Sequence, residues 1–257
     1  MATYLSGLGL RIVTIPFDRE SGRTDPAAVE RALGADTAAL LLAYPNFLGV
    51  IEPLAKLCEL AHAAGALAVV SADPIAQAVL RPPGELGADI ATAEGQPLGI
   101  PLFYGGPYVG LLATSMRNVR QMPGRLAGIA HDERGRRGFV LTLKPREQDI
   151  RREKATSNIC TNEALIATAV AIYLAALGPS GLRDVAEHCY HRSHYLATEL
   201  ARVAGIDARF SGRFFREMVV RTPVAPAELN RRLWEEHGIV GGWIWAASTW
   251  AWTAAGC

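Results

Sequence analysis

Histidines gather in one short stretch and raise the question of a metal site. His188, His191 and His194 are three residues apart, and Cys189 follows the first of them. Residues three apart are neighbours on a helix. Three such histidines do not share one tight tetrahedral face, however, and no carboxylate stands correctly beside them. We interpret the stretch as a solvated, histidine-rich helix face and predict no metal site.

A phosphate-binding loop is the second chemistry to consider. Dinucleotide sites place Gly-x-Gly-x-x-Gly between a strand and a helix, so that the phosphates reach backbone N–H groups. That pattern is absent from the chain, and residues 105–110 (GGPYVG) offer glycines in another order. Pro107 removes a donor there and no Lys-Ser/Thr follows, so we interpret this segment as a structural turn.

Cations concentrate in residues 117–154, which hold eleven Lys and Arg against five Asp and Glu, a net charge of +6. The stretch contains a single aromatic residue, Phe139, and the whole chain carries only +1, which argues against a nucleic-acid partner. Opposite charges lie three or four residues apart in 146–154, for example Glu147 and Arg151. This spacing is typical of a salt-bridged helix surface.

These side chains need elements to position them, and the first hundred residues predict an α/β layer. The nearly continuous apolar run at 37–44 predicts a strand buried on both faces. A cap and an N1 proline at 24–26 predict a helix start. The predicted order is strand 10–16, helix 24–33, strand 37–44, helix 53–64 and strand 66–70. Short connections between such elements imply parallel βαβ units.

The remainder of the chain is organised differently. Gly and Pro punctuate residues 81–107, which predicts mostly loop at the side of the sheet where ligands bind. A smaller α+β region then follows. Its predicted elements are a buried helix 162–177, a break at Gly178-Pro179, an amphipathic helix 181–203, strands 207–210 and 217–221, and a helix from Pro226 to His237. We therefore expect a large domain over 1–150 and a small one over 151–242.

Length and composition bound the class of protein. With 257 residues, 50% of them hydrophobic, the chain has the balance of a soluble globular protein. Its four cysteines are scattered, which fits a reducing compartment. Residues 1–6 lack the basic segment followed by an apolar core that a signal peptide needs, and the longest apolar stretch, 164–177, is too short to span a bilayer. We predict a cytoplasmic protein with no membrane association.

One segment carries a family resemblance. Residues 151–162, RREKATSNICTN, resemble the signature of the pyridoxal-phosphate-dependent glycine dehydrogenase (decarboxylating), the P-protein of the glycine cleavage system. The resemblance extends over residues 1 to about 242 and is most specific to subunit 1 of the two-subunit bacterial form. Further segments similar to the family lie, in the same order, at 45–52, 82–89, 94–99, 105–108, 122–125 and 135–139.

The resemblance implies a fold, a reaction and partners. The implied fold is α/β, pyridoxal-phosphate fold type I (aspartate-aminotransferase-like), with a large domain followed by a small C-terminal α+β domain. The implied complex decarboxylates glycine on pyridoxal phosphate and transfers the aminomethyl group to the lipoyl arm of the H-protein. Such chemistry needs a lysine for the Schiff base and a carboxylate on the ring nitrogen of the cofactor.

This chain departs from the family at both positions. Alignment on Ile100, Pro101 and Pro107 puts Gln96 at the lysine position, and no lysine occurs between Lys56 and Lys144. An amide cannot form an imine. A softer alignment puts Ser71 at the position of the ring-nitrogen carboxylate, with Asp73 two residues further on. We therefore predict no catalytic residue here: the partner, subunit 2, holds the cofactor, and this chain binds none covalently.

The expected contribution of this chain is to complete the site of subunit 2. The cations Arg151, Arg152 and Lys154 could bind the cofactor phosphate, the glycine carboxylate or an acidic carrier protein. The alternative is that the same residues only cap and brace a helix start. Two other hypotheses remain: a purely structural or regulatory subunit, and an independent pyridoxal enzyme that uses Lys144. The candidates for the shared site are Arg151, Arg152, Lys154, Thr156, Ser157, Asn158 and Thr161.

Both ends of the chain depart from the family pattern. Family members carry a long segment before the position of Met1, so we expect a fragment whose large domain is incomplete and exposes an unpaired sheet edge. Residues 243–257 contain four tryptophans and no charged side chain. A shifted reading frame after Gly242 can restore Leu-Asp-Leu-Gly-Arg-Leu-Tyr, close to the family. We therefore expect 243–257 to be an out-of-frame tail.

Overall fold

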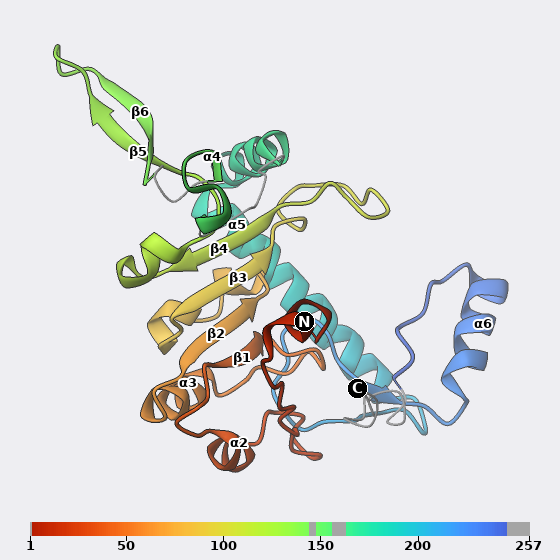
Figure 1. The fold of residues 1–257 in the computed structure, drawn as a ribbon. Helices are drawn as coiled ribbons and strands as arrows, with labels where there is room; N and C mark the ends of the chain where they lie inside the picture. The colour runs from red at the N-terminus through yellow and green to blue at the C-terminus, as the bar shows by residue number, and fades with distance from the viewer. Residues whose placement is uncertain (1, 144–147, 156–162, 246–257) are drawn as a thin grey trace.

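A four-stranded mixed sheet forms the centre of the computed structural model, which describes residues 2–143, 148–155 and 163–245 (Figure 1). The strand order is β1-β2-β3-β4. The first three strands are parallel, with Ala39 opposite Leu67 and Val69 opposite Ile90, and the fourth runs antiparallel to the third. The strands are β1 (Ala39–Tyr44), β2 (Leu67–Ala72), β3 (Ile90–Glu94) and β4 (Gly110–Thr114).

Two helices cover one face of this sheet. In α2 (Pro26–Ala32) the Asp25 side chain accepts the Ala27 N–H at 2.9 Å and Pro26 occupies the first turn, as the sequence predicts. The second helix, α3 (Leu54–Ala63), ends before Gly65, whose φ of 77° suits a glycine. The core between helices and sheet consists of Val29, Leu40, Leu42, Tyr44, Leu54, Leu57, Cys58, Ala61, Ala66, Ala68 and Val70.

The structure differs from two predictions about the strands. Leu41 is 49% exposed between buried neighbours, so β1 alternates and is not buried on both faces. Residues 10–16 form no strand, since no described strand lies beside them to supply a ladder, and only an isolated bridge joins Phe17 to Thr24. A third prediction was also incomplete, because β3 lies within the segment expected to be mostly loop.

One long helical element, α5 (Ala164–Leu200), packs on a second core. Gly178 has non-helical dihedral angles (φ 63°, ψ −178°), so two helices meet at a kink, as the Gly178-Pro179 break predicts. The first half was expected to be buried, but Leu165 and Ile172 are exposed. The second core contains Ile75, Ala76, Leu98, Ile100, Val109, Val170, Ala186 and Phe215.

By length and composition, α5 is the one described helix apolar enough to cross a membrane, which is weak evidence for a span. The kink limits its straight apolar part to residues 164–177. At about 1.5 Å per residue these 14 residues extend about 21 Å, short of the roughly 30 Å hydrocarbon core of a bilayer.

The C-terminal part returns to the sheet. The predicted short strands pair as β7 (Asp207–Ala208) and β8 (Val220–Arg221), and α6 (Pro226–His237) follows as predicted. The segment between the strands lies against the loop after β1. The Ile51 N–H donates to the Arg213 carbonyl at 2.8 Å, and the Phe215 N–H donates to the Gly49 carbonyl at 3.2 Å.

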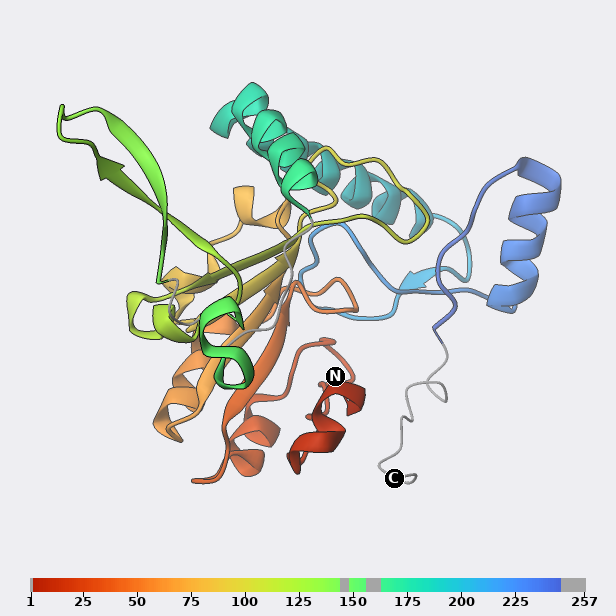
Figure 2. The ribbon, with the colours of Figure 1, turned by 45° about the horizontal axis from the view of Figure 1, so that its top comes forward.

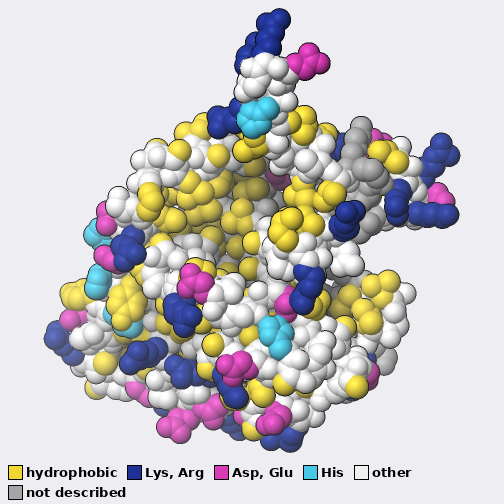
Figure 3. Space-filling view, turned by 90° about the vertical axis from the view of Figure 1, so that its left-hand side faces the viewer, with side chains coloured by type: hydrophobic (Ala, Val, Ile, Leu, Met, Phe, Trp, Pro, Cys, Tyr) yellow, Lys and Arg dark blue, Asp and Glu magenta, His cyan; other side chains and the backbone are white. Residues whose placement is uncertain are grey.

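A hairpin projects from the rest of the chain (Figures 1 and 3). It consists of β5 (Leu126–His131) and β6 (Arg137–Thr142), which pair antiparallel over their full length. Every residue of β6 is exposed. Two further helices have four residues each: α1 (Ala2–Leu5) near the N-terminus, and α4 (Gln148–Arg151) after the hairpin. Short 3-10 helices lie in several of the connecting segments.

Candidate functional site

Polar side chains follow each of the three parallel strands where the strand ends. Asn46 comes after β1, Asp73 after β2 and Gln96 after β3. Because the carboxyl ends of parallel strands share one edge of the sheet, these residues lie along the edge where α/β proteins bind ligands. This is the edge at which the sequence places the substituted lysine position.

Gln96 is held by its own loop. Its side-chain Nε2 donates to the Ile100 carbonyl at 2.6 Å, and its backbone N–H donates to Glu94 Oε1 at 3.0 Å. The preceding Gly95 allows close packing, since a Cβ there would lie 2.6 Å from Val109 Cγ1. The residue that the sequence predicts at the lysine position is therefore a half-buried amide engaged with the backbone.

The two carboxylate alternatives on β2 also have defined surroundings. Ser71 is exposed near the end of the strand. Asp73 accepts the Ile75 N–H at 2.9 Å through Oδ1, and its Oδ2 lies 2.8 Å from Arg216 Nη2. The Asp73 carboxylate is thus occupied by a turn and by an ion pair with the C-terminal part of the chain.

A buried carboxylate braces the loop after β1. Glu52 is 5% exposed, and its Oε1 accepts from the Thr24 hydroxyl at 2.9 Å and from Asn46 Nδ2 at 2.8 Å. The Thr24 N–H donates to the same carboxylate at 3.0–3.1 Å. Asn46 Oδ1 in turn accepts the Leu48 and Val50 N–H groups. This network fixes the conformation of residues 46–52.

A second carboxylate, Asp89, directly precedes β3 and bonds to residues of β2, of α3 and of the segment after β4. Asp89 Oδ2 accepts the Ala68 N–H at 2.9 Å and lies 2.8 Å from His62 Nε2, while Oδ1 accepts from Arg117 at 2.8 Å. Burial raises the pKa of Asp89, but the bonds from Ala68, His62 and Arg117 outweigh burial and hold that pKa below its usual value.

The cationic candidates lie on the surface, more than 50 residues after Gln96 in the sequence. Arg151 ends α4, and Arg152 and Lys154 form the following turn; all three are exposed, and none makes an ion pair with a described residue. Arg152 has a left-handed backbone (φ 50°), which is uncommon for a residue with a side chain. Among the described residues, no hydrogen bond or ion pair connects this segment to Gln96.

Several predicted residues fall outside the part of the chain that the structure describes. The predicted pair of Glu147 with Arg151 involves one such residue, because Glu147 lies in 144–147. Most of the predicted tail, 246–257, is also outside. The candidates concerned are Thr156, Ser157, Asn158 and Thr161 of the shared site, and Lys144 of the alternative enzyme.

The histidine stretch is partly as predicted. His188 and His191 are exposed on α5. His194, in contrast, stacks on Phe214 at 4.0 Å between ring centroids and its Nε2 lies 3.1 Å from the Phe214 carbonyl. It braces the C-terminal segment, a role that only the tertiary contact reveals. Within the described residues, no three His, Cys, Asp or Glu side chains are grouped to hold a metal ion.

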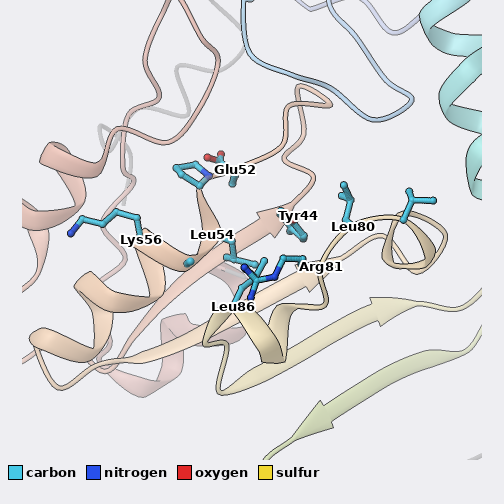
Figure 4. A pocket seen from close by; sticks show the side chains of 10 residues that line it. Tyr44, Glu52, Leu54, Lys56, Leu80, Arg81 and Leu86 are labelled. Atoms are coloured by element: carbon cyan, nitrogen blue, oxygen red, sulfur yellow. The ribbon is translucent and has the colours of Figure 1, made fainter.

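One open pocket of about 560 Å³ lies near the end of β1, beside the start of α3 (Figure 4). Its walls are mainly apolar, from Leu54, Leu80 and Leu86. Tyr44 is 5% exposed, and burial raises the pKa of its phenol, with Arg81 acting in the opposite direction. The Tyr44 hydroxyl makes no hydrogen bond to a described residue.

Comparison with known proteins decides the family. The sequence model of the family described as "Glycine cleavage system P-protein" matches residues 1–237. This chain belongs to the glycine cleavage system P-protein family. The match covers the sheet, α5, the hairpin and all of α6.

The similar proteins are named for one subunit. "Probable glycine dehydrogenase (decarboxylating) subunit 1" of Thermomicrobium roseum is 53% identical over 242 residues, which is 94% of this chain and 54% of that protein. The protein of the same name from Moorella thermoacetica is 48% identical over the same shares. This chain thus spans about half the length of the curated relatives it matches.

Solved structures confirm the expected fold type. A crystal structure of glycine decarboxylase (P-protein) of the glycine cleavage system, in inhibitor-bound form, superposes with a TM-score of 0.84 at 44% identity, covering 91% of this chain and 52% of that one. The Burkholderia pseudomallei sphingosine-1-phosphate lyase and a NifS-like protein match at a TM-score of 0.57, and at 16% and 18% identity they show the fold alone.

The sequence did not predict two features of the site, the ion pair of Asp73 and the hydrogen bonds of Glu52. The partner of Asp73 is Arg216, which lies far along the chain, and no local pattern links the two. No local pattern links Thr24 to Asn46 either, although both bond to Glu52. A usable signal existed only for Asn46 and Glu52, which lie in the family-like segment 45–52.

Proposed function

We propose that this chain acts as subunit 1 of a glycine dehydrogenase (decarboxylating), in complex with a second subunit. The complex would decarboxylate glycine and pass the aminomethyl group to the lipoyl arm of an H-protein in the cytoplasm. The observation that carries the proposal is the 53% identity, over 94% of this chain, to a protein named as that subunit. The fold of glycine decarboxylase at a TM-score of 0.84 supports it.

The residues of this chain do not fit a covalently held pyridoxal phosphate. The Gln96 amide already donates to the Ile100 carbonyl and offers no amine. The Asp73 carboxylate is engaged by Arg216. We therefore assign the cofactor to the partner subunit and derive no chemical step on this chain.

The contribution proposed for this chain is a set of cations at a site shared with the partner. Arg151, Arg152 and Lys154 are exposed and make no ion pair with described residues, so they are available to an anionic group on another molecule. The left-handed backbone of Arg152 supports a role for this turn, since such conformations cluster at functional sites. Thr156, Ser157, Asn158 and Thr161 belong to the same proposed site.

The proposed organisation follows from the same reasoning. Residues 1–150 form part of the large domain and residues 151–242 form the small domain. We further propose that residues 243–257 are an out-of-frame tail. Resequencing the gene across Gly242 tests the tail, and an intact in-frame tryptophan-rich sequence contradicts it.

The test of the function is reconstitution with the partner. The chain and subunit 2 are purified separately, and glycine-dependent CO2 release is measured for each alone and for the mixture with cofactor and H-protein. We expect activity only in the mixture. We also expect borohydride to trap the cofactor on subunit 2 alone. A trapped cofactor on this chain by itself would refute the assignment.

Charge variants separate the shared site from a purely structural or regulatory subunit. Arg151→Ala and Lys154→Ala should each lower the activity of the mixture about 100-fold, the effect typical of losing one charged contact to a reacting group. Arg183→Ala, which changes another exposed arginine, on α5, is the matched control and should leave activity unchanged. Full activity in the first two variants would favour the structural role.

A further inference from the structure

The hairpin of β5 and β6 presents an apolar face that nothing in the described chain covers. Pairing runs from Leu126 opposite Thr142 to His131 opposite Arg137, and side chains alternate between the two faces. One face carries Ile129, Phe139 and Leu141, which are 64%, 70% and 53% exposed. We call these three residues the docking face.

An isolated two-stranded hairpin is at best marginally stable in water. Here the hairpin of residues 126–142, which we call the arm, projects from the body, and every residue of β6 is exposed (Figures 1 and 2). Large apolar side chains gathered on one face of such an arm are typical of a surface that another molecule covers. A hollow rich in hydrophobic side chains opens below the projecting part in Figure 3.

Charge defines the surface that would fit against the arm. At its tip, Asp132 is engaged by Arg136 at 2.7 Å, which leaves Arg134 and Arg137 in excess over Glu133. Arg137 lies 5.8 Å from the Phe139 ring centroid, beside the docking face. The whole stretch 117–154 carries +6. A complementary surface is therefore apolar at its centre with acidic residues at its rim.

The arm is continuous with the proposed shared site. Leu143 follows β6 and Gln148 begins α4, so five residue steps, or at most about 17 Å of extended chain, separate them. Arg151 and Arg152 follow at once. A molecule held on the arm would thus be held close to these cations.

We propose that the docking face of the β5–β6 hairpin binds the second subunit of the complex. This inference rests on the proposed function, because it takes the partner from it. The continuity with Arg151 and the positive charge favour that subunit over a second copy of this chain, which would bring a like-charged arm against it.

The experiment measures binding of this chain to separately purified subunit 2 by calorimetry. Phe139→Ala and Ile129→Ala should each raise the dissociation constant about 30-fold, as expected for the loss of central apolar contacts. The matched control is Val140→Ala, which removes a similar side chain, 49% exposed, from the opposite face of the same strand. It should change binding less than threefold. Urea midpoints of the free variants should equal that of the parent chain.

Hydrogen exchange gives an independent readout. Amides of residues 126–142 should exchange at least tenfold more slowly in the complex than in the free chain. If the parent chain binds subunit 2 but the docking-face variants bind equally well and the hairpin gains no protection, the docking proposal is wrong while the proposed function stands. If the parent chain does not bind subunit 2, the proposed function itself fails. Self-association lost in Phe139→Ala would overturn the choice of partner.

Discussion

Removing the Glu52 carboxylate should loosen the loop that carries Asn46. The change is Glu52→Leu, which keeps the approximate volume but removes both acceptors. The Thr24 N–H and hydroxyl then lose their acceptor, and Asn46 Nδ2 keeps only the Gly22 carbonyl at 2.8 Å. Leaving buried donors unpaired costs about 1–3 kcal/mol per group, so we expect a loss of about 3–5 kcal/mol in the free energy of unfolding.

A conservative variant and a control sharpen this prediction. Glu52→Gln keeps one oxygen, which can occupy the Oε1 position where most of the donors meet, so about 1–2 kcal/mol should be lost. Glu59→Gln alters a side chain that is 69% exposed on the helix that follows, α3, and should change stability by less than about 0.5 kcal/mol. The assay is urea unfolding followed by circular dichroism at 222 nm. A loss below about 1 kcal/mol in Glu52→Leu would refute the reasoning.

The other predictions concern acid stability, packing and thiol reactivity. The donors around Asp89 outweigh burial and lower its folded-state pKa. Ionised Asp89 therefore stabilises the folded state fully above the unfolded-state pKa of about 3.9, and this stabilisation is lost as pH falls through the folded-state pKa. Asp89→Asn should flatten that part of a plot of urea midpoint against pH. Gly49→Ala would place a Cβ 1.9 Å from the Glu217 carbonyl oxygen at a φ of 80°, so it should lower the free energy of unfolding by about 2 kcal/mol or more and speed limited proteolysis. Burial raises the pKa of the Cys58 thiol to about 11, so native-state alkylation at pH 8 should modify Cys189 before Cys58. Peptide mass spectrometry measures the two rates, and equal rates would contradict the prediction.

Local signals in the sequence predicted much of this fold correctly. The Asp25-Pro26 cap, the break at Gly178-Pro179 and the helix beginning at Pro226 are decided by residues within one turn of the feature. The family-like segments and the absence of lysine between Lys56 and Lys144 are likewise read directly from the sequence. These are properties of short stretches, and they stay the same whatever packs around them.

Long-range partners decided the rest. A strand pattern at 10–16 cannot become a strand without a neighbouring strand to bond to, and the apolar run of β1 cannot show from its composition that one of its faces is left open. The pairing of Asp73 with Arg216 depends on how the chain returns to the sheet after α5. The sequence by itself therefore determined the family, most of the local elements and the absence of lysine between Lys56 and Lys144. Only the tertiary structure decided which faces are covered and which carboxylates are occupied, because burial and pairing depend on residues that are distant along the chain.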